Sequence, residues 1–174
     1  VDHGIRKNSG KEALQVKKLL LNKGIKLKIL KNRKKIKNNI QKKARDARYK
    51  LLENFCKKKG AKSLIVAHHQ DDQVETFLIR LSRGSGVEGL SSMQEMTTFK
   101  SGIRLIRPLL DFKKSHLNNI AKIFFGKTFK DPSNKDRKFL RTNIRLLRKN
   151  LSNKGIDFEK IIRSIKNISS TKEA

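Results

Sequence analysis

The residues best suited to chemistry lie in the segment AHHQDDQVET, residues 67–76. It joins a short apolar run, which predicts a buried strand, to a helical pattern that begins near Asp72. Ligands of open α/β sheets bind where strands end, and helix N-termini attract phosphate. Two histidines (His68, His69) and two aspartates (Asp71, Asp72) at such a place can bind a metal-bound triphosphate or transfer a proton. The alternative is that Asp72 only caps the helix and the histidines are surface residues.

A pair of arginines lies in the segment ARDARY, residues 44–49. Arg45 and Arg48 are about one helical turn apart, so their side chains point in similar directions. Such a pair can stabilise the negative charge of a phosphoryl group during its transfer. From position alone a solvated helix face is the stronger interpretation, because exposed charges contribute little.

The segment RGSGVEGL, residues 83–90, is rich in glycine. Glycines allow the backbone to approach a phosphate or a base closely. It is not a Walker motif, because no Lys-Ser or Lys-Thr pair follows the glycines. A flexible loop after a helix explains the same residues equally well.

A stripe of arginines follows one side of a predicted helix near the end of the chain: Arg137, Arg141, Arg145 and Arg148. Arginines on one side of an amphipathic helix fit contact with an RNA backbone. A solvated helix face is the equally supported alternative.

The elements that must position these residues alternate between strand and helix over the first 110 residues. Two capping-box spacings, Ser9 with Glu12 and Asp72 with Glu75, indicate helix starts. This alternation predicts an α/β fold, with a parallel sheet that helices cover on both faces. The predicted strands are 1–4, 25–29, 63–67 and 103–106, and the predicted helices begin near residues 9, 44 and 72.

After Pro108 the pattern becomes helical. The spacing predicts helices over 113–125, 136–151 and 156–168, with a turn at 131–134 and a frayed polar tail from Ser169. We therefore predict two domains. Residues 1–110 form a nucleotide-binding α/β domain, and residues 111–174 form a basic helical segment.

Composition points to a polyanionic partner. The 174 residues include 44 Lys and Arg against 15 Asp and Glu, a formal net charge of +29. A field of one sign attracts nucleic acid first, although a Lys- and Asn-rich coding bias raises the number of exposed lysines everywhere.

No apolar run is long enough to span a bilayer, so no membrane partner is expected. The single cysteine, Cys56, excludes an internal disulfide and a Cys-rich metal site, and it favours a cytoplasmic location.

Six motifs in one order resemble a known family, the tRNA(Ile)-lysidine synthases, which are PP-loop ATP pyrophosphatases. The resemblance runs from residue 1 to about residue 150. It implies a Rossmann-like domain of the adenine nucleotide alpha hydrolase type. The motifs are DHGIR at 2–6, ARDARY at 44–49, AHHQDDQVET at 67–76, RGSG at 83–86, RPLL at 107–110 and DPSN at 131–134.

The resemblance implies an ATP-dependent carbon–nitrogen ligase. Its substrates would be ATP with Mg²⁺, free L-lysine and the isoleucine tRNA that has a CAU anticodon. ATP first adenylates the oxygen on carbon 2 of the wobble cytidine and releases pyrophosphate. The ε-amine of lysine then attacks carbon 2 and expels AMP.

Similarity to the family also assigns residues to sites. Arg48, His68 and Asp72 would be catalytic, and Asp72 would also hold Mg²⁺. The surrounding ATP and substrate pocket would contain Asp2, His3, Arg45, His69, Asp71 and Glu75. Contacts with tRNA would come from Arg83, Gly84, Ser85, Gly86, Arg137, Arg141 and Arg145.

One departure from the family pattern bears on activity. The family's phosphate-binding loop, SGGxDS, belongs upstream of Val1, and no segment of this chain supplies it. We therefore expect an N-terminally truncated chain that is inactive alone. Two alternatives stay open: a non-catalytic RNA-binding remnant, and another PP-loop tRNA-modifying enzyme. The single cysteine disfavours the thiolases among the latter. The oligomeric state is also open, a homodimer included.

Overall fold

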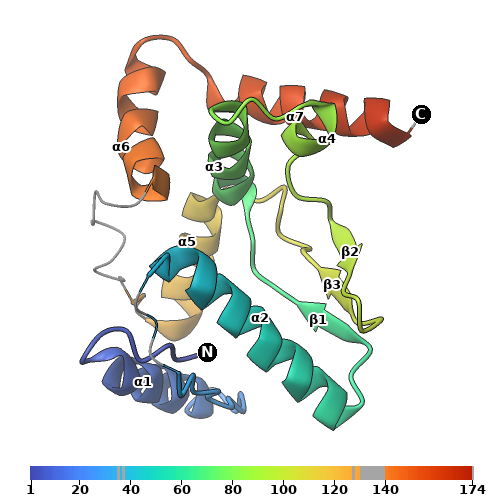
Figure 1. The fold of residues 1–174 in the computed structure, drawn as a ribbon. Coiled ribbons are helices and arrows are strands. Elements are labelled where there is room, and N and C mark those ends of the chain that lie inside the picture. Colours follow the sequence, from blue (N-terminus) through green and yellow to red (C-terminus); the bar gives the residue numbers. More distant parts are fainter. Residues whose placement is uncertain (35, 37, 127, 130–139, 174) are drawn as a thin grey trace. The chain divides into compact units, whose positions relative to one another are not determined.

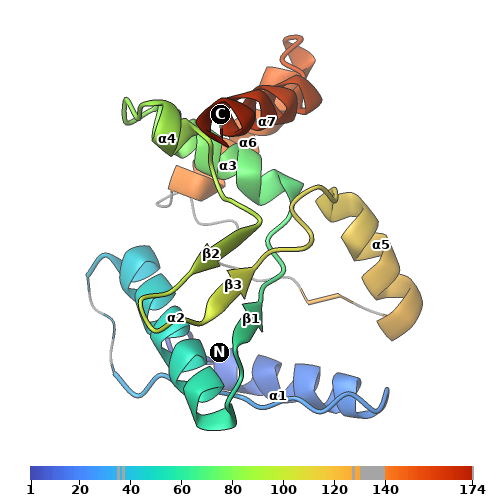
Figure 2. The same ribbon diagram turned by 90° about the vertical axis from the view of Figure 1, so that its right-hand side faces the viewer.

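The computed structural model describes residues 1–34, 36, 38–126, 128–129 and 140–173 (Figures 1 and 2). The chain divides into two compact units. Unit 1 comprises residues 1–64 and 98–105, and unit 2 comprises residues 65–97 and 106–174. These units do not follow the predicted domains, residues 1–110 and 111–174. The predicted domain boundary stays a prediction.

The described residues of unit 1 form two helices, as predicted: α1 (Ser9–Leu21) and α2 (Ile40–Lys59). The predicted capping box at the start of α1 is wrong, because both of its side chains have other partners. The hydroxyl of Ser9 donates to Asp2 at 2.7 Å, and the carboxylate of Glu12 forms an ion pair with Arg6 at 2.7 Å. Helix α2 ends at Gly60, which has φ of +65° and so takes the left-handed conformation that glycine tolerates best.

The predicted strands 1–4 and 25–29 reduce to a single parallel bridge between Asp2 and Lys31. The backbone N–H of Asp2 donates to Leu30 at 2.8 Å, and that of Asn32 donates to Asp2 at 2.8 Å. Alternation of apolar residues identified a half-buried extended segment, but a strand also needs a partner of matching length. In the described part of unit 1 that partner is one residue long.

The sheet has three short strands: β1 (Ser63–Ile65), β2 (Met96–Thr98) and β3 (Arg104–Ile106), in the order β1-β3-β2. Strands β1 and β3 pair in parallel, since Arg104 N–H donates to Lys62 and Val66 N–H donates to Ile106. Strands β2 and β3 form an antiparallel hairpin, which the sequence did not predict. The expectation that 63–67 is buried is also wrong: Ile65 lies on an edge strand and is 68% exposed.

Unit 2 is mainly helical. A core joins Val74 of α3 (Gln70–Leu81) to Phe158, Ile162 and Ile165 of α7 (Phe158–Glu173), and both views show these helices packed against each other (Figures 1 and 2). Helix α7 continues through the tail that was expected to fray, and there the hydroxyl of Ser169 donates to the Ser91 carbonyl. The other helices among the described residues of unit 2 are α4 (Val87–Leu90), α5 (Lys114–Phe125) and α6 (Leu140–Asn153).

The predicted α/β class is therefore confirmed, with a parallel pair of strands and a helical segment after them. The predicted turn at 131–134 and the first residues of the predicted helix 136–151 lie outside the described residues. None of the helices in the described ranges combines the length and the apolar composition that crossing a bilayer requires.

Candidate functional site

The first cluster of predicted site residues surrounds the start of α3. His69 is the N-cap residue, in extended conformation, and its backbone N–H donates to the carboxylate of Asp72 at 3.1 Å. The Nδ1 atom of His69 lies 3.4 Å from the same oxygen of Asp72. The capping pair is thus His69 with Asp72, not Asp72 with Glu75 as the spacing predicted. Asp72 caps its helix and still has a second oxygen, Oδ1, that is free of this role.

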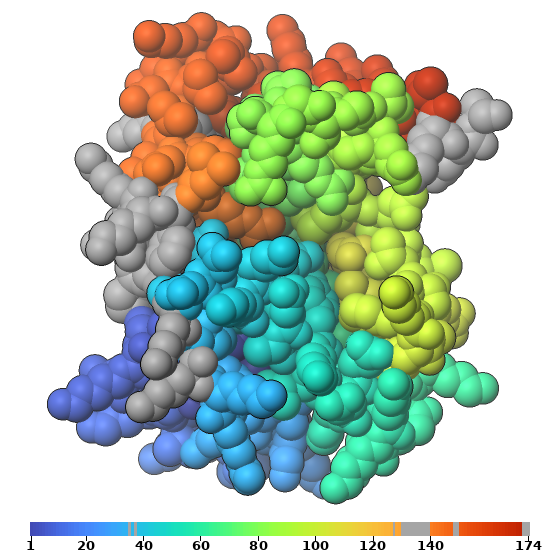
Figure 3. All heavy atoms as spheres, in the orientation of Figure 1, coloured from blue at the N-terminus to red at the C-terminus, as the bar shows by residue number. Residues whose placement is uncertain are grey.

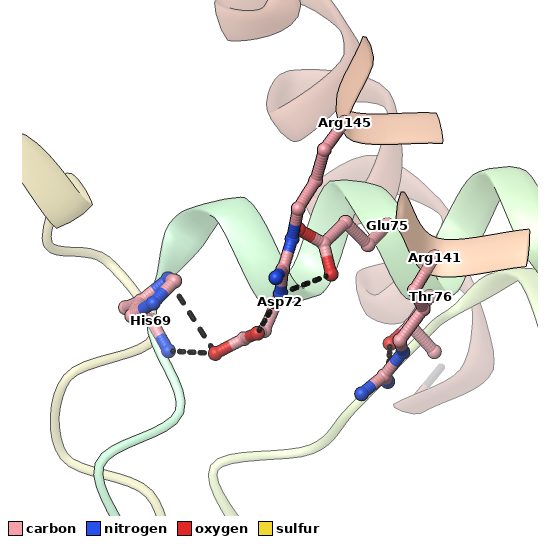
Figure 4. Close-up of polar contacts among 6 residues, drawn as sticks. All are labelled: His69, Asp72, Glu75, Thr76, Arg141 and Arg145. Carbon is pink, nitrogen blue, oxygen red and sulfur yellow. Dashed lines mark hydrogen bonds and ion pairs between the residues drawn. The ribbon is translucent and has the colours of Figure 1, made fainter. Parts of the chain in front are cut away.

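One helical turn further along α3, Glu75 is only 4% exposed and pairs with Arg145 of α6 (Figure 4). Two nitrogens of the Arg145 guanidinium bind the carboxylate: Nε donates to Oε1, and Nη2 donates to Oε2 at 3.0 Å. The hydrogen bond with Glu75 is the main cause that raises the pKa of Arg145. Nη2 also lies 4.0 Å from Oδ1 of Asp72. Arg145 therefore neutralises a buried carboxylate and adds positive charge beside Asp72.

A second contact joins the same two helices. Arg141 of α6 donates to the hydroxyl of Thr76 on α3 at 3.3 Å. Arg141 and Arg145 are one turn apart on α6, as Thr76 and Asp72 are on α3, so the two rows face each other. Their assignment to tRNA stays a prediction, but the described contacts give both arginines a role inside unit 2. The sequence shows acidic residues at helical spacing in α3 and arginines at helical spacing in α6, but neither spacing shows that these two helices face each other.

His68 and Asp71 complete this part of the candidate site. Both are half-buried, and Asp71 lines a cavity of about 490 Å³ beside Arg145. The apolar part of its lining comes from α3 and α7, through Val74, Phe158 and Ile162, and the rest of the lining is polar or charged. A site of this kind combines a helix N-terminus, charged side chains and an apolar wall, which suits a ligand with both polar and apolar parts.

The second cluster lies in unit 1. Arg48 of α2 donates through Nε to Nε2 of His3 at 3.4 Å. Burial lowers the pKa of His3, and the positive charge of Arg48 lowers it further. Hydrogen bonds from Ser9 and from the Gly4 N–H hold the pKa of Asp2 below its usual value. The structure thus brings Asp2, His3 and Arg48 into one neighbourhood, with His3 favoured in its neutral form.

The side chains of Arg45 and Arg48 have different partners. The Arg45 guanidinium stacks over the ring of Tyr49, 5.0 Å from the ring centre. Tyr49 in turn contacts Phe99, with 5.8 Å between ring centres. Arg45 is therefore half-buried against aromatic rings, whereas Arg48 is exposed and available to a ligand.

The glycine-rich loop joins α3 to α4 in unit 2. Arg83, Gly84 and Gly86 are exposed and Ser85 is half-buried, and the green spheres of this part of the chain lie at the surface in Figure 3. Gly84 has φ of +68°, which explains a glycine there. Arg137, the remaining residue predicted to bind tRNA, lies outside the described residues.

Asp72 is the residue predicted to hold a metal ion. No three His, Cys, Asp or Glu side chains gather into a metal-binding group within the described ranges. Mg²⁺ that arrives with a triphosphate needs only one or two protein carboxylates, however. Oδ1 of Asp72, outside the capping interaction, is an oxygen that fits such a role.

Sequence reasoning missed Gln73 and Arg80, two α3 residues that bind the segment after the glycine-rich loop. Gln73 is buried and bonds to the backbone of Met93, and Arg80 bonds to the carbonyls of Gly89 and Ser92. Their separation of seven residues places them on one face of a helix. That spacing was the available signal, but a lone Gln and Arg at this spacing are too common to interpret.

Comparisons with known proteins agree with the motifs. The PP-loop domain family matches residues 1–151, which confirms the predicted Rossmann-like α/β class. The tRNA(Ile)-lysidine synthase of Wolbachia pipientis wMel is 48% identical over 163 residues, covering 92% of this chain and 38% of that protein. The enzyme of the same name from Wolbachia sp. subsp. Brugia malayi (strain TRS) is 42% identical over 163 residues, with the same shares. That of Bradyrhizobium diazoefficiens is 41% identical over 167 residues, covering 94% of this chain and 45% of that protein. This chain therefore spans less than half the length of these curated relatives.

Proposed function

Because this chain belongs to the PP-loop domain family, we propose that it is the ATP-binding part of a tRNA(Ile)-lysidine synthase. The observation that carries the proposal is the 48% identity with such a synthase over 163 residues. The matched span includes the start of α3, the arginines of α2 and the glycine-rich loop. The proposed substrates are ATP, L-lysine and isoleucine tRNA with a CAU anticodon, and the proposed location is the cytoplasm.

The proposed reaction has two steps. The oxygen on carbon 2 of the wobble cytidine attacks the α-phosphate of ATP, and the bond to pyrophosphate breaks. The neutral ε-amine of lysine then attacks carbon 2, and the bond from carbon 2 to the oxygen of AMP breaks. The first step needs positive charge at the α-phosphate, and the second needs a lysine amine that has lost its proton.

Residues at the start of α3 suit the first requirement. The N-terminal end of α3 is the positive end of the helix dipole and favours a phosphate nearby, while the N–H groups of Gln70 and Asp72 already donate to the carbonyls of Phe112 and His69. We assign His68, which precedes the helix, to positioning the phosphate or the cytidine. Asp72 takes one of two roles in the proposal: it orients Mg²⁺ or the lysine ammonium group. Mg²⁺, when bound with ATP, would supply further positive charge for the phosphates, and Asp72 is the residue that would hold it.

Arg48 is assigned to stabilising the charge on the phosphate, with Asp2, His3 and Arg45 around it. The assignment follows the family motif rather than the placement of one unit against the other. The geometry within unit 1 supports this assignment, because Arg48 is exposed and its described partner, His3, has a lowered pKa that favours the neutral imidazole. An arginine paired with a neutral imidazole keeps its full charge for a ligand.

Two segments of unit 2 are proposed to contact tRNA. The loop Arg83–Gly86 has an exposed arginine and exposed backbone, both suited to phosphate. The helix that contains Arg141 and Arg145, with Arg137 before it, is the second segment. Because Arg141 and Arg145 also hold α6 to α3, we expect the loop to make the larger contribution.

The test is pyrophosphate release by the complete product of the gene, with the CAU isoleucine tRNA and without lysine. The proposal predicts ATP-dependent release of pyrophosphate, and loss of the signal when uridine replaces the wobble cytidine. RNA binding with no pyrophosphate release and no anticodon preference would instead support the non-catalytic remnant.

A variant separates the two roles of Asp72. In Asp72→Asn the amide oxygen can still accept the hydrogen bond from His69, so the helix cap survives while the charge is lost. If Asp72 orients Mg²⁺, pyrophosphate release falls; if it orients lysine, release continues and the KM for lysine rises. Asp46→Asn, an exposed change on α2, is the matched control.

A further inference from the structure

The segment after α3 is held from inside by two side chains of that helix. We propose that Gln73 and Arg80 are positioning residues for RNA binding, which fix residues 83–93 in the shape that lets Arg83 meet the tRNA backbone. The proposal rests on the proposed function, since it takes the Arg83–Gly86 loop as the RNA contact.

Gln73 closes the far end of the segment. Its side-chain nitrogen donates to the Met93 carbonyl at 2.7 Å, and its side-chain oxygen accepts from the Met93 N–H at 2.9 Å. Both groups are buried, so no water replaces either bond if the amide is removed. The hydroxyl of Ser92 adds a bond to the Gln73 carbonyl at 3.1 Å. Met93 is thereby held against α3 through both its N–H and its carbonyl.

Arg80, two turns along the same face of α3, holds the segment at Gly89 and again at Ser92. Its Nη1 atom donates to the carbonyls of Gly89 at 2.6 Å and of Ser92 at 2.9 Å. The Gly89 carbonyl, in the short helix α4, also accepts from the Ser92 N–H at 3.2 Å, and the Ser92 carbonyl lies just beyond that helix. One guanidinium therefore ties the end of α4 to the residues that follow it through charge-assisted hydrogen bonds. Arg80 is committed to the fold, whereas Arg83, three residues later, is exposed.

The segment is also tight within itself. A Cβ atom added to Gly89 would lie 2.6 Å from the Cβ of Ser85, so only glycine fits beside the loop. Ser92 has φ of +62°, a left-handed conformation that a serine adopts only when its surroundings require it. Both Arg80 and Gln73 bond at Ser92 or its neighbour, which is where that conformation must be held.

These contacts have a consequence for RNA affinity. A loop with a fixed shape loses little conformational freedom when it binds, so more of the contact energy appears as affinity. Removing Arg80 would free the loop without touching Arg83. The affinity for tRNA should therefore fall even though every side chain that faces the RNA is still present.

The experiment compares Arg80→Met with Arg163→Met, a change of the same charge at an exposed position of α7. In the complete protein without RNA, Arg80→Met should raise amide hydrogen exchange at residues 83–92, and Arg163→Met should not. The Kd for tRNA should rise about tenfold in Arg80→Met and less than about twofold in the control. Arg80→Lys keeps one donor for the same carbonyls and should recover part of the affinity.

A double-mutant cycle separates positioning from direct contact. In an Arg83→Ala background, Arg80→Met should raise Kd by less than about twofold, because the contact that Arg80 positions is already gone. A full tenfold effect in that background would overturn the proposal, as would unchanged affinity in an Arg80→Met protein whose loop exchanges faster. If the wild-type protein binds RNA but releases no pyrophosphate, the proposed enzyme fails, and the cycle still decides the role of Arg80.

Discussion

The two units differ most in what balances their positive charge. Unit 1 has 24 of the 44 Lys and Arg residues and only 4 of the 15 Asp and Glu residues, whereas unit 2 has 20 and 11. In unit 2 the arginines at 80, 107, 141 and 145 all bond within the unit, to carbonyls, hydroxyls or a carboxylate. In unit 1 the described partner of Arg48 is His3, whose lowered pKa favours the neutral imidazole. A stripe of arginines is thus weak support for an RNA surface until the acidic residues that face it have been located.

The largest effect expected from this comparison concerns activity. Arg48→Ala should slow pyrophosphate release roughly 100- to 1,000-fold, as removal of one group that stabilises transition-state charge does. The folded state should lose little, because Arg48 is exposed and its bond to His3 is long. The measurement is single-turnover adenylation of tRNA, with Arg33→Ala, an exposed change in the same unit, as the control. Adenylation at the wild-type rate would show that Arg48 has no catalytic role in this step.

The corresponding change in unit 2 should act on stability. Arg145→Ala leaves Glu75 charged, buried and unpaired, so the free energy of unfolding should fall by about 3 kcal/mol. Urea denaturation measures this change, and Arg163→Ala should stay within about 0.5 kcal/mol of the wild type. In a cycle with Glu75→Gln, the double variant should lose less than the two single losses together. Additive losses would show that the pair is not coupled.

A smaller effect concerns the surplus charge of unit 1. Replacing Lys58, Lys59 and Lys62 with Gln should weaken RNA binding roughly tenfold at low salt and flatten its salt dependence, because unbalanced lysines are available to phosphate. The matched variant changes Lys122, Lys154 and Lys160 in unit 2, which are equally exposed. Filter binding over a range of salt concentrations compares the two. Equal losses would mean that the difference in charge balance has no bearing on RNA.

The smallest effect is a dependence on pH. The pKa of His3 is lowered in the folded state, so unfolded chains take up its proton at a higher pH than folded ones. Unit 1 should therefore be most stable above about pH 6.5 and lose stability as the pH falls. The lowered pKa of Asp2 acts in the same direction at lower pH. NMR titration of the His3 ring should give a pKa below 6.5, and Arg48→Ala should raise it; a value above 6.5 would contradict the described surroundings of His3.

Local patterns predicted the helices well and the strands poorly. Helix α3 follows from its apolar spacing, and α2 ends at Gly60 as expected, since both signals lie within a few residues. The strand at 25–29 and the burial of 63–67 were wrong because strand formation depends on partners distant in sequence. The hairpin strand Met96–Thr98 was missed for the same reason. The family was predicted from six motifs in one order, and the PP-loop match over 1–151 confirms it.

The candidate site was predictable as a set of residue types, but not as a set of contacts. His69 and Asp72 were both chosen, yet the cap they form lies three residues earlier than the spacing indicated. Glu75 and Arg145 were assigned to different roles, although they bind each other. Pairing between α3 and α6 is a tertiary choice, which the periodicity of either helix alone does not contain.

The most direct test of the proposed function is the product of the reaction. The complete gene product would be incubated with ATP, labelled lysine and CAU isoleucine tRNA. The wobble nucleoside would then be isolated, and its mass would be measured by mass spectrometry. A tRNA(Ile)-lysidine synthase would join one lysine to the cytidine and release one AMP and one pyrophosphate for each. An unmodified cytidine, from a protein that nonetheless binds the tRNA, would contradict the proposed function.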